Sequence, residues 1–358
     1  MNTTRQNRMM KLMTEAKVDA FVFFDVNNIL YLSGFTGTDG VLIATEQSSF
    51  FLTDSRYEAQ AQQQVNADRV ICYQKKIDAV IMQLVAQGVK KVGFEASFLP
   101  VSTWQELTRL TAGRFEWIGV VEPLKTLRGV KAADEIRALE AAAQLHVDAF
   151  AAICPLLVPG TCEREIALQL EFALKRAGGE DKAFDFIVAS GYRGALPHGV
   201  ASDKKLASGE LVTIDFGTRI DGYHSDETIT VAIGSVSTEL RAIFDIVLQA
   251  HDQAIDAVKP GVRLATLDAV ARDFIAQRGY AEAFGHGLGH GVGLDIHEYP
   301  ALSPRATAAL EEGMVVTIEP GIYLPGVGGV RIEDTVVVTA DGCRCLTRLP
   351  KHFQQFAA

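Results

Sequence analysis

The chain has 358 residues, of which 48% are hydrophobic and 22% charged, and it carries a formal net charge of −10. This composition is that of an ordinary globular protein and excludes a disordered chain. The negative charge argues against a nucleic-acid partner, because phosphate binding requires a basic face. No apolar run approaches the roughly 18 residues that a membrane-spanning helix needs, which argues against a membrane partner.

The first 125 residues alternate between short apolar runs and amphipathic segments, which predicts an α/β domain without a catalytic constellation of its own. Helices are expected at 56–65 and 77–87. Strands are expected at 19–25, 40–44, 49–53 and 91–94.

A domain boundary is expected near 124–129, so that residues 1–125 and 126–358 form two domains. A long helix from Ala132 to Leu157 should open the second domain and end at Pro159-Gly160, a strong stop signal. The sequence then repeats itself. L-x-x-G-x-x-V-T-I-D-x-G at 206–217 returns as L-x-x-G-x-x-V-T-I-E-x-G at 310–321, an offset of 104 residues. Two copies of a helix–helix–strand unit predict one α+β domain with pseudo-twofold symmetry.

Five side chains in this domain have the character of metal ligands: Asp215, Asp226, His290, Glu319 and Glu333. Four carboxylates beside one imidazole offer more oxygen ligands than a structural zinc site uses, because such sites prefer cysteine and histidine. They suit two divalent cations that share bridging carboxylates and hold an activated water. The alternative is that these acids are ordinary residues beside turns. Asp215 and Glu319 argue against it, because each ends an apolar strand where an unpaired carboxylate is costly.

Two predicted hairpins should bring the four acids of the metal site close together in pairs. Asp221-Gly222 is a strong turn signal, and it predicts that Asp215 and Asp226 lie opposite each other or one pair apart. Glu319 and Glu333 should repeat this arrangement around the glycine-rich turn at 325–329.

The histidines divide by context. His286, His290 and His297 fall in one glycine-rich stretch, which predicts a loop or extended segment rather than a helix. An H-E-x-x-H zinc helix and a phosphate-binding glycine loop are both absent. His198, in Pro-His-Gly, is equally compatible with a turn and with a site. His224 is undecided, and three histidines are expected at the surface: His146, His251 and His352.

The cysteines and the N-terminal residues indicate in which cellular compartment the protein is expected. An odd number of cysteines at irregular spacing predicts free thiols rather than a disulfide framework. They are Cys72, Cys154, Cys162, Cys343 and Cys345. The charged first residues are not followed by an apolar stretch of signal-peptide length, so a cytoplasmic protein is expected.

With these motifs the chain resembles the pita-bread metallopeptidase family, which includes methionine aminopeptidase, Xaa-Pro aminopeptidase and prolidase. The N-terminal segments N-I-L-Y-L-S-G-F-T-G at 28–37 and L-T-D-S-R-Y at 52–57 resemble the creatinase/prolidase-type N-terminal domain. Methionine aminopeptidases generally lack that domain, so the resemblance favours the proline-directed branch. It implies an α/β N-terminal domain followed by a pita-bread catalytic domain, and a homodimer.

The resemblance also implies roles for the metal ligands. Asp215 would chelate one metal, Asp226 and Glu333 would bridge both, and His290 and Glu319 would complete the other. The metals would be manganese by family precedent, with cobalt or zinc as alternatives. Glu319 would also accept the proton of the nucleophilic water.

Further positions match family residues at the substrate site. His198 and His297 would line it and stabilise the tetrahedral intermediate, His286 would lie near the proline-side pocket, and Arg331 would support Glu333. In one departure, Ile229 replaces the arginine that many members carry, so a salt bridge or an oligomer contact is expected to be missing.

The leading function is a Xaa-Pro aminopeptidase, whose substrate is a peptide with proline at the second position. The segment 33–40 contains no lysine or arginine to bind a free carboxylate, which favours an open cleft. A Xaa-Pro dipeptidase is the alternative within the family. A metal-free pita-bread binding module and creatinase-type chemistry are disfavoured, because all five ligand residues are present.

Overall fold

The computed structural model describes residues 3–357. Contacts divide the chain into two units, Met1–Leu127 and Arg128–Ala358. Among the described residues, no helix combines the length and the apolar character needed to cross a bilayer.

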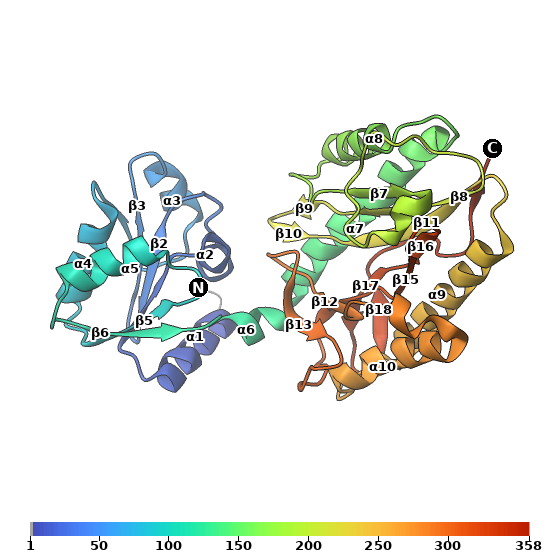
Figure 1. The fold of residues 1–358 in the computed structure, drawn as a ribbon. Coiled ribbons are helices and arrows are strands. Elements are labelled where there is room, and N and C mark those ends of the chain that lie inside the picture. Colours follow the sequence, from blue (N-terminus) through green and yellow to red (C-terminus); the bar gives the residue numbers. More distant parts are fainter. Residues whose placement is uncertain (1–2, 358) are drawn as a thin grey trace. The chain divides into compact units, whose positions relative to one another are not determined.

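The first unit is a six-stranded sheet with helices around it (Figure 1). The strand order is β4-β3-β2-β1-β5-β6, and β2 is antiparallel to both of its neighbours. The strands are β1 (Ala20–Phe23), β2 (Val41–Thr45), β3 (Ser49–Thr53), β4 (Arg69–Cys72), β5 (Lys91–Glu95) and β6 (Glu116–Val120). The helices are α1 (Thr3–Ala16), α2 (Val26–Ser33), α3 (Glu58–Gln64), α4 (Lys76–Ala86) and α5 (Val101–Leu110). The predicted α/β class is confirmed, as are the four predicted strands and two predicted helices.

Asn28, the first residue of the motif at 28–37, takes part in a hydrogen-bond network at the start of helix α2. Asp25 caps the helix through the backbone N–H of Asn27. Glu95, at the end of β5, accepts hydrogen bonds from the backbone N–H groups of Phe24 (2.6 Å) and Asp25 (2.9 Å). Its other oxygen accepts one from Nδ2 of Asn28 at 2.6 Å. A buried carboxylate therefore joins β5 to the N-terminus of α2.

The second unit contains two similar halves, after the short helix α6 (Lys125–Gly129). The first half comprises α7 (Ala133–Ile153), α8 (Glu163–Arg176), β7 (Ile187–Ser190), β8 (Glu210–Phe216), β9 (Arg219–Ile220), β10 (Tyr223–His224) and β11 (Glu227–Ile233). The second half comprises α9 (Thr238–Ala257), α10 (Leu264–Ile275), β12 (Gly289–Gly291), β13 (Glu298–Leu302), β14 (Val315–Ile318), β15 (Gly321–Leu324), β16 (Gly328–Arg331), β17 (Asp334–Val338) and β18 (Cys343–Cys345). A final strand, β19 (Gln355–Phe356), pairs with β11.

The internal repeat is confirmed down to single hydrogen bonds. The N–H of Gly160 donates to the carbonyl of Leu206 at 2.9 Å, and the N–H of Gly261 donates to that of Leu310 at 2.8 Å. Each half is a helix–helix–strand unit, as predicted. Helix α7 ends earlier than expected, at Ile153, because Pro155 has no N–H to continue the helix.

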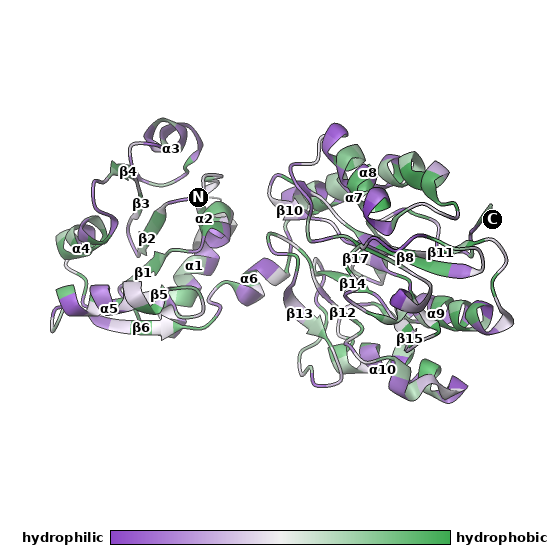
Figure 2. Ribbon diagram, turned by 45° about the horizontal axis from the view of Figure 1, so that its top comes forward, coloured by the Kyte–Doolittle hydropathy of each residue, from purple (hydrophilic) through white to green (hydrophobic). Residues whose placement is uncertain are grey.

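Each helix pair packs on strands of its own half. In Figures 1 and 2, α8 and α10 lie on opposite sides of the strands of this unit. Figure 2 shows the strand β11 largely in green, the colour of hydrophobic residues. Ile229 belongs to this strand, is 2% exposed, and packs in the core beneath α7 and α8. Where the family arginine was expected, this chain therefore has a core residue.

Two histidines expected at the surface are buried, so that prediction is wrong. His146 is 0% exposed and His251 is 3% exposed, whereas His352 is exposed as expected. Both buried rings lie close to acids on neighbouring strands, Glu227 and Asp334. His224 is also buried, and its Nδ1 lies 3.1 Å from the carbonyl oxygen of Gly293.

Candidate metal centre

A cavity of about 440 Å³ opens in the second unit, a volume typical of small-molecule sites. All nine residues predicted for the site line it: His198, Asp215, Asp226, His286, His290, His297, Glu319, Arg331 and Glu333. Apolar side chains complete the lining, among them Phe184, Ile187, Val200 and Leu302. The structure thus brings together residues up to 135 positions apart, from His198 to Glu333.

The first hairpin differs from the prediction in its register. Asp215 pairs with Thr228, two residues beyond Asp226. Asp221 and Gly222 both have positive φ, 51° and 79°, so the turn is centred between them, where the Asp-Gly signal predicts it. Direct opposition of Asp215 and Asp226 would require a centre one residue earlier. A shift of one residue in the turn centre moves every partner by two residues. The prediction that Asp215 and Asp226 are opposed or one pair apart is therefore wrong, although both line the cavity.

The second hairpin has the predicted register. Ile318 pairs with Asp334 on one side of the site, and Gly321 pairs with Arg331 on the other. The same register on both sides places Glu319 opposite Glu333. Directly opposed residues have Cβ atoms about 4.5–5.5 Å apart, which allows both carboxylates to reach one cation.

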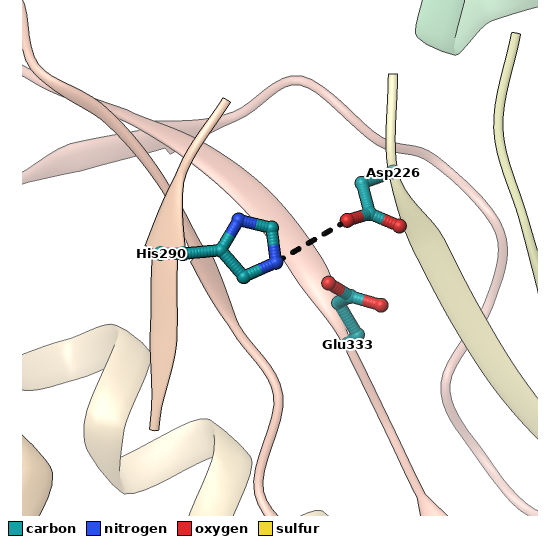
Figure 3. A group of neighbouring side chains, drawn as sticks. All are labelled: Asp226, His290 and Glu333. Atoms are coloured by element: carbon teal, nitrogen blue, oxygen red, sulfur yellow. Dashed lines mark ion pairs between the residues drawn. The ribbon is translucent and has the colours of Figure 1, made fainter. Parts of the chain in front are cut away.

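His290 faces the acids from β12, the extended segment predicted for the glycine-rich stretch. Its Nδ1 lies 3.1 Å from the carbonyl oxygen of Gly291, which assigns the proton to Nδ1. The other nitrogen, Nε2, lies 3.5 Å from Oδ2 of Asp226 and 3.3 Å from Oε1 of Glu319. Figure 3 shows His290, Asp226 and Glu333 pointing toward one another. Each offers one ligand atom, and these three atoms lie within 4.8 Å of one another. This is the orientation of a histidine ligand with its lone pair on Nε2.

The electrostatics of the cluster are unfavourable without a cation. Burial raises the pKa of Asp226 well above its usual range, and the charge of Glu333 raises it further. Burial and the charge of Glu319 likewise raise the pKa of Glu333. Burial lowers the pKa of His290, which keeps its imidazole neutral and available as a ligand. These acids repel one another, and a divalent cation would remove that repulsion.

Asp215 and Arg331 form a buried pair that the sequence did not predict. Nη2 of Arg331 lies 2.6 Å from Oδ2 of Asp215. Arg331 reaches Glu333 only through Thr228, whose hydroxyl accepts from Nε of Arg331 and donates to Oε2 of Glu333 at 2.6 Å. Arg331 is thus connected to Glu333 through Thr228, while its ion-pair partner is Asp215, which the sequence did not predict.

The other carboxylate oxygen of Asp215 tests whether the residues fit a metal. Oδ1 is buried and has no hydrogen-bond partner among the residues the structure describes. A buried oxygen without a partner is costly, and it is uncommon outside functional sites. An orphaned oxygen beside three further acids and a neutral imidazole is the donor set of two hard divalent cations. The residues therefore fit the metals that the family resemblance implies.

The three other histidines that line the cavity differ in the contacts that they make. Nδ1 of His286 lies 2.8 Å from the carbonyl oxygen of Gly287, and its Nε2 lies 2.9 Å from the hydroxyl of Tyr323. The ring of His297 lies 4.3 Å from that of His290, centroid to centroid. Burial lowers the pKa of His286 and of His297, so both rings are neutral near pH 7. His198 lies on the cavity wall beside Pro197.

The loop that carries His297 is anchored by charges that the sequence did not reveal. Nη2 of Arg128 lies 2.5 Å from Oδ2 of Asp295 and 2.6 Å from Oε2 of Glu298. Nζ of Lys131 lies 2.6 Å from Oε1 of Glu298. These ion pairs hold both flanks of His297.

Two threonines were also missed. Thr228 bonds to Glu333, and the hydroxyl of Thr317 donates to Oε1 of Glu319 at 3.2 Å. A signal for the first was present: the order acid–acid–threonine occurs at 226–228 and again at 333–335.

Comparisons with known proteins agree with this site. Residues 137–340 match the model of metallopeptidase family M24, and residues 5–130 match the creatinase/prolidase N-terminal domain. The chain is 39% identical to the Xaa-Pro dipeptidase of Pyrococcus horikoshii, over 95% of this chain and 96% of that protein.

Two solved structures are similar along nearly the whole chain. The Xaa-Pro dipeptidase from Bacillus anthracis superposes with a TM-score of 0.96 at 40% identity and covers 99% of both chains. The X-Pro aminopeptidase from Thermotoga maritima superposes with a TM-score of 0.89 at 38% identity and covers 96% of this chain and 99% of that one. The two-domain fold class expected from the sequence is confirmed. The chain therefore belongs to metallopeptidase family M24 and is a metallo-exopeptidase with a creatinase/prolidase N-terminal domain.

Proposed function

We propose that this enzyme hydrolyses the bond between an N-terminal residue and a following proline, with Xaa-Pro dipeptides as its main substrates. The observation that carries the proposal is the convergence of four carboxylates and His290 in one cavity of a chain similar to prolidases along its whole length. The named relatives support the dipeptidase over the aminopeptidase that the sequence favoured.

Five residues would hold the metals: Asp215, Asp226, His290, Glu319 and Glu333. Two divalent cations, manganese in this proposal, would lower the pKa of a water so that it attacks near neutral pH. Burial raises the pKa of Glu319, which suits this carboxyl group to accept the proton of the attacking water. His297 would donate a hydrogen bond to the developing oxyanion, because its ring is neutral and lines the cavity.

The apolar part of the cavity suits the proline side of the substrate. Phe184, Ile187, Val200 and Leu302 line it, and a pyrrolidine ring needs an apolar wall without hydrogen-bonding demands. His198, which lies beside these residues, would contact the substrate carbonyl.

A specific observation keeps the aminopeptidase as a second candidate. Among the described residues that line the cavity, Arg331 is the one lysine or arginine, and it is paired with Asp215. A dipeptidase needs a donor for the free carboxylate after proline, and an arginine is the usual choice. Within this cavity a neutral histidine would have to serve instead.

The test compares a Xaa-Pro dipeptide with the Xaa-Pro-Xaa tripeptide that shares its N-terminal residue. The dipeptidase predicts a kcat/KM at least tenfold higher for the dipeptide, about 1.4 kcal/mol of preference for the free carboxylate. Equal or faster cleavage of the tripeptide would establish the aminopeptidase. The metal content of the purified protein separates both from a metal-free binding module. The homodimer remains a prediction of the family resemblance, and the cytoplasmic location remains a prediction from the cysteines and the N-terminal residues.

A further inference from the structure

Asp226 and Glu333 directly precede the strands β11 and β17, and each of these strands begins with a second acid, Glu227 and Asp334. Adjacent residues of a strand face opposite sides of the sheet, so these acids point away from the cavity. Both are buried, Glu227 at 0% and Asp334 at 7% exposed. Two further negative charges therefore lie directly behind the metal centre.

One cation joins both acids. Nζ of Lys351 lies 2.6 Å from Oε1 of Glu227 and 3.3 Å from Oδ1 of Asp334. Burial alone would lower the pKa of Lys351, but the two carboxylates outweigh it and raise the pKa above its ordinary value. Lys351 is thus a buried, charged bridge between two strands.

The segment around Lys351 contacts the same acids. The N–H of Leu349 donates to Oε1 of Glu227 at 2.9 Å, and the hydroxyl of Thr347 donates to Oδ1 of Asp334 at 2.6 Å. The C-terminal segment therefore binds one acid from each half of the repeat.

The internal repeat supplies a histidine to each acid. Nδ1 of His146 lies 2.7 Å from Oε2 of Glu227, and Nε2 of His251 lies 3.3 Å from Oδ2 of Asp334. His146 and His251 are the fourteenth residues of α7 and α9, so they are equivalent in the two halves. Lys351 belongs to neither half and is shared by both.

The strands need such a link because no β-ladder joins them. β11 belongs to the sheet β19-β11-β8-β7, and β17 belongs to the sheet β13-β12-β14-β17-β18. Near the metal centre they are linked by single hydrogen bonds. The N–H of Glu333 donates to the carbonyl of Thr228 at 3.1 Å, the hydroxyl of Thr228 donates to Oε2 of Glu333 at 2.6 Å, and the hydroxyl of Thr335 donates to the carbonyl of Asp226 at 2.8 Å. The separation of Asp226 and Glu333 therefore depends on a small number of contacts.

We propose that Lys351 is a positioning residue, which holds these two strands at the separation that lets Asp226 and Glu333 share two divalent cations. The inference rests on the metal centre of the proposed function. It predicts that loss of Lys351 weakens metal binding by about tenfold or more, the usual effect of removing an outer partner of metal ligands.

The sign of the effect distinguishes positioning from simple electrostatics. Removing a positive charge near the site should strengthen the binding of a cation by Coulomb's law, whereas losing the positioning contact should weaken it. The test titrates manganese into chelator-treated protein by calorimetry and compares wild type with Lys351→Met. Arg348→Met is the matched control, because Arg348 lies in the same segment but its side chain is 56% exposed, and among the described residues its one ion pair is with Glu140, at 3.5 Å. Its Kd should stay within twofold of wild type.

A charge-balanced variant covers the case in which Lys351→Met does not fold. Lys351→Met combined with Glu227→Gln removes one charge of each sign, so electrostatics predicts no change in affinity. Positioning still predicts a Kd about tenfold higher, with a native circular dichroism spectrum. A purely structural role would lower the melting temperature but leave the Kd of the folded protein unchanged.

The outcomes separate this inference from the function itself. A wild-type protein that binds no manganese would refute the metal centre and the inference together. A wild type that binds two ions, beside a double variant whose Kd is within twofold, would overturn the role of Lys351 alone.

Discussion

Glu95 makes the stability of the N-terminal domain depend on pH. Burial raises the pKa of Glu95 to about 7, although hydrogen bonds from Asn28, Asp25 and Phe24 act in the opposite direction. The unfolded chain should titrate near the ordinary value of 4.5. Between these values the folded state binds more protons than the unfolded state. Stability is therefore highest at low pH, falls as the pH rises from about 4.5 to 7, and is constant above that range.

The size of the effect follows from the two values. Each pKa unit corresponds to about 1.36 kcal/mol, so the full shift amounts to about 3.4 kcal/mol above pH 7. At pH 5 the carboxyl group of Glu95 is only partly ionised in the unfolded chain, and the loss of folding free energy there is about 0.8 kcal/mol. The domain should thus lose about 2.5 kcal/mol between pH 5 and pH 8 through this one residue.

The assay is urea unfolding followed by tryptophan fluorescence. The chain has two tryptophans, Trp104 and Trp117, and both lie in the first unit, so the signal reports that domain. Trp104 stacks on Phe94, the neighbour of Glu95, at 4.6 Å. Wild type and Glu95→Gln are compared at pH 5 and pH 8. The amide does not titrate, so the difference between the two proteins isolates the proton linkage.

The variant should gain about 2.5 kcal/mol relative to wild type on going from pH 5 to pH 8. Glu116→Gln is the control, because Glu116 lies on the adjacent strand β6 with its side chain 63% exposed. It should behave as wild type at both pH values. A difference between wild type and Glu95→Gln that changes by less than about 0.5 kcal/mol would refute the reasoning.

Three further predictions concern the catalytic domain. Asp226→Ala or Glu333→Ala should abolish turnover of Xaa-Pro substrates, and activity within about tenfold of wild type, only ~1.4 kcal/mol of barrier, would rule out a dinuclear centre. Manganese should raise the melting temperature of chelator-treated protein, because it binds the folded state alone; a transition that does not move would count against the site. Arg331→Met should lower the free energy of unfolding by about 3–5 kcal/mol in urea, because it leaves the buried Asp215 unpaired, and a loss below about 1 kcal/mol would contradict that pairing.

The sequence by itself determined the composition of the site. The repeat at an offset of 104 residues, the turn at Asp221-Gly222 and the glycine-rich stretch around His290 are local patterns, and all nine residues that they and the family resemblance indicated line one cavity. Such patterns are readable because glycine, proline and apolar periodicity act on the backbone within a few residues of their own position.

Only the tertiary structure decided how these residues are supported. Arg331 pairs with Asp215, 116 positions away, and Lys351 links strands from the two halves. His146 and His251 have unremarkable surroundings in sequence, yet both are buried against acids, because the helices pack them onto strands more than 80 positions away. The first hairpin is a different case: its turn lies at Asp221-Gly222 as predicted, and a turn at that place pairs Asp215 with Thr228 rather than with Asp226. Contacts between distant segments depend on how the helices and sheets pack together, and local sequence patterns do not specify that packing.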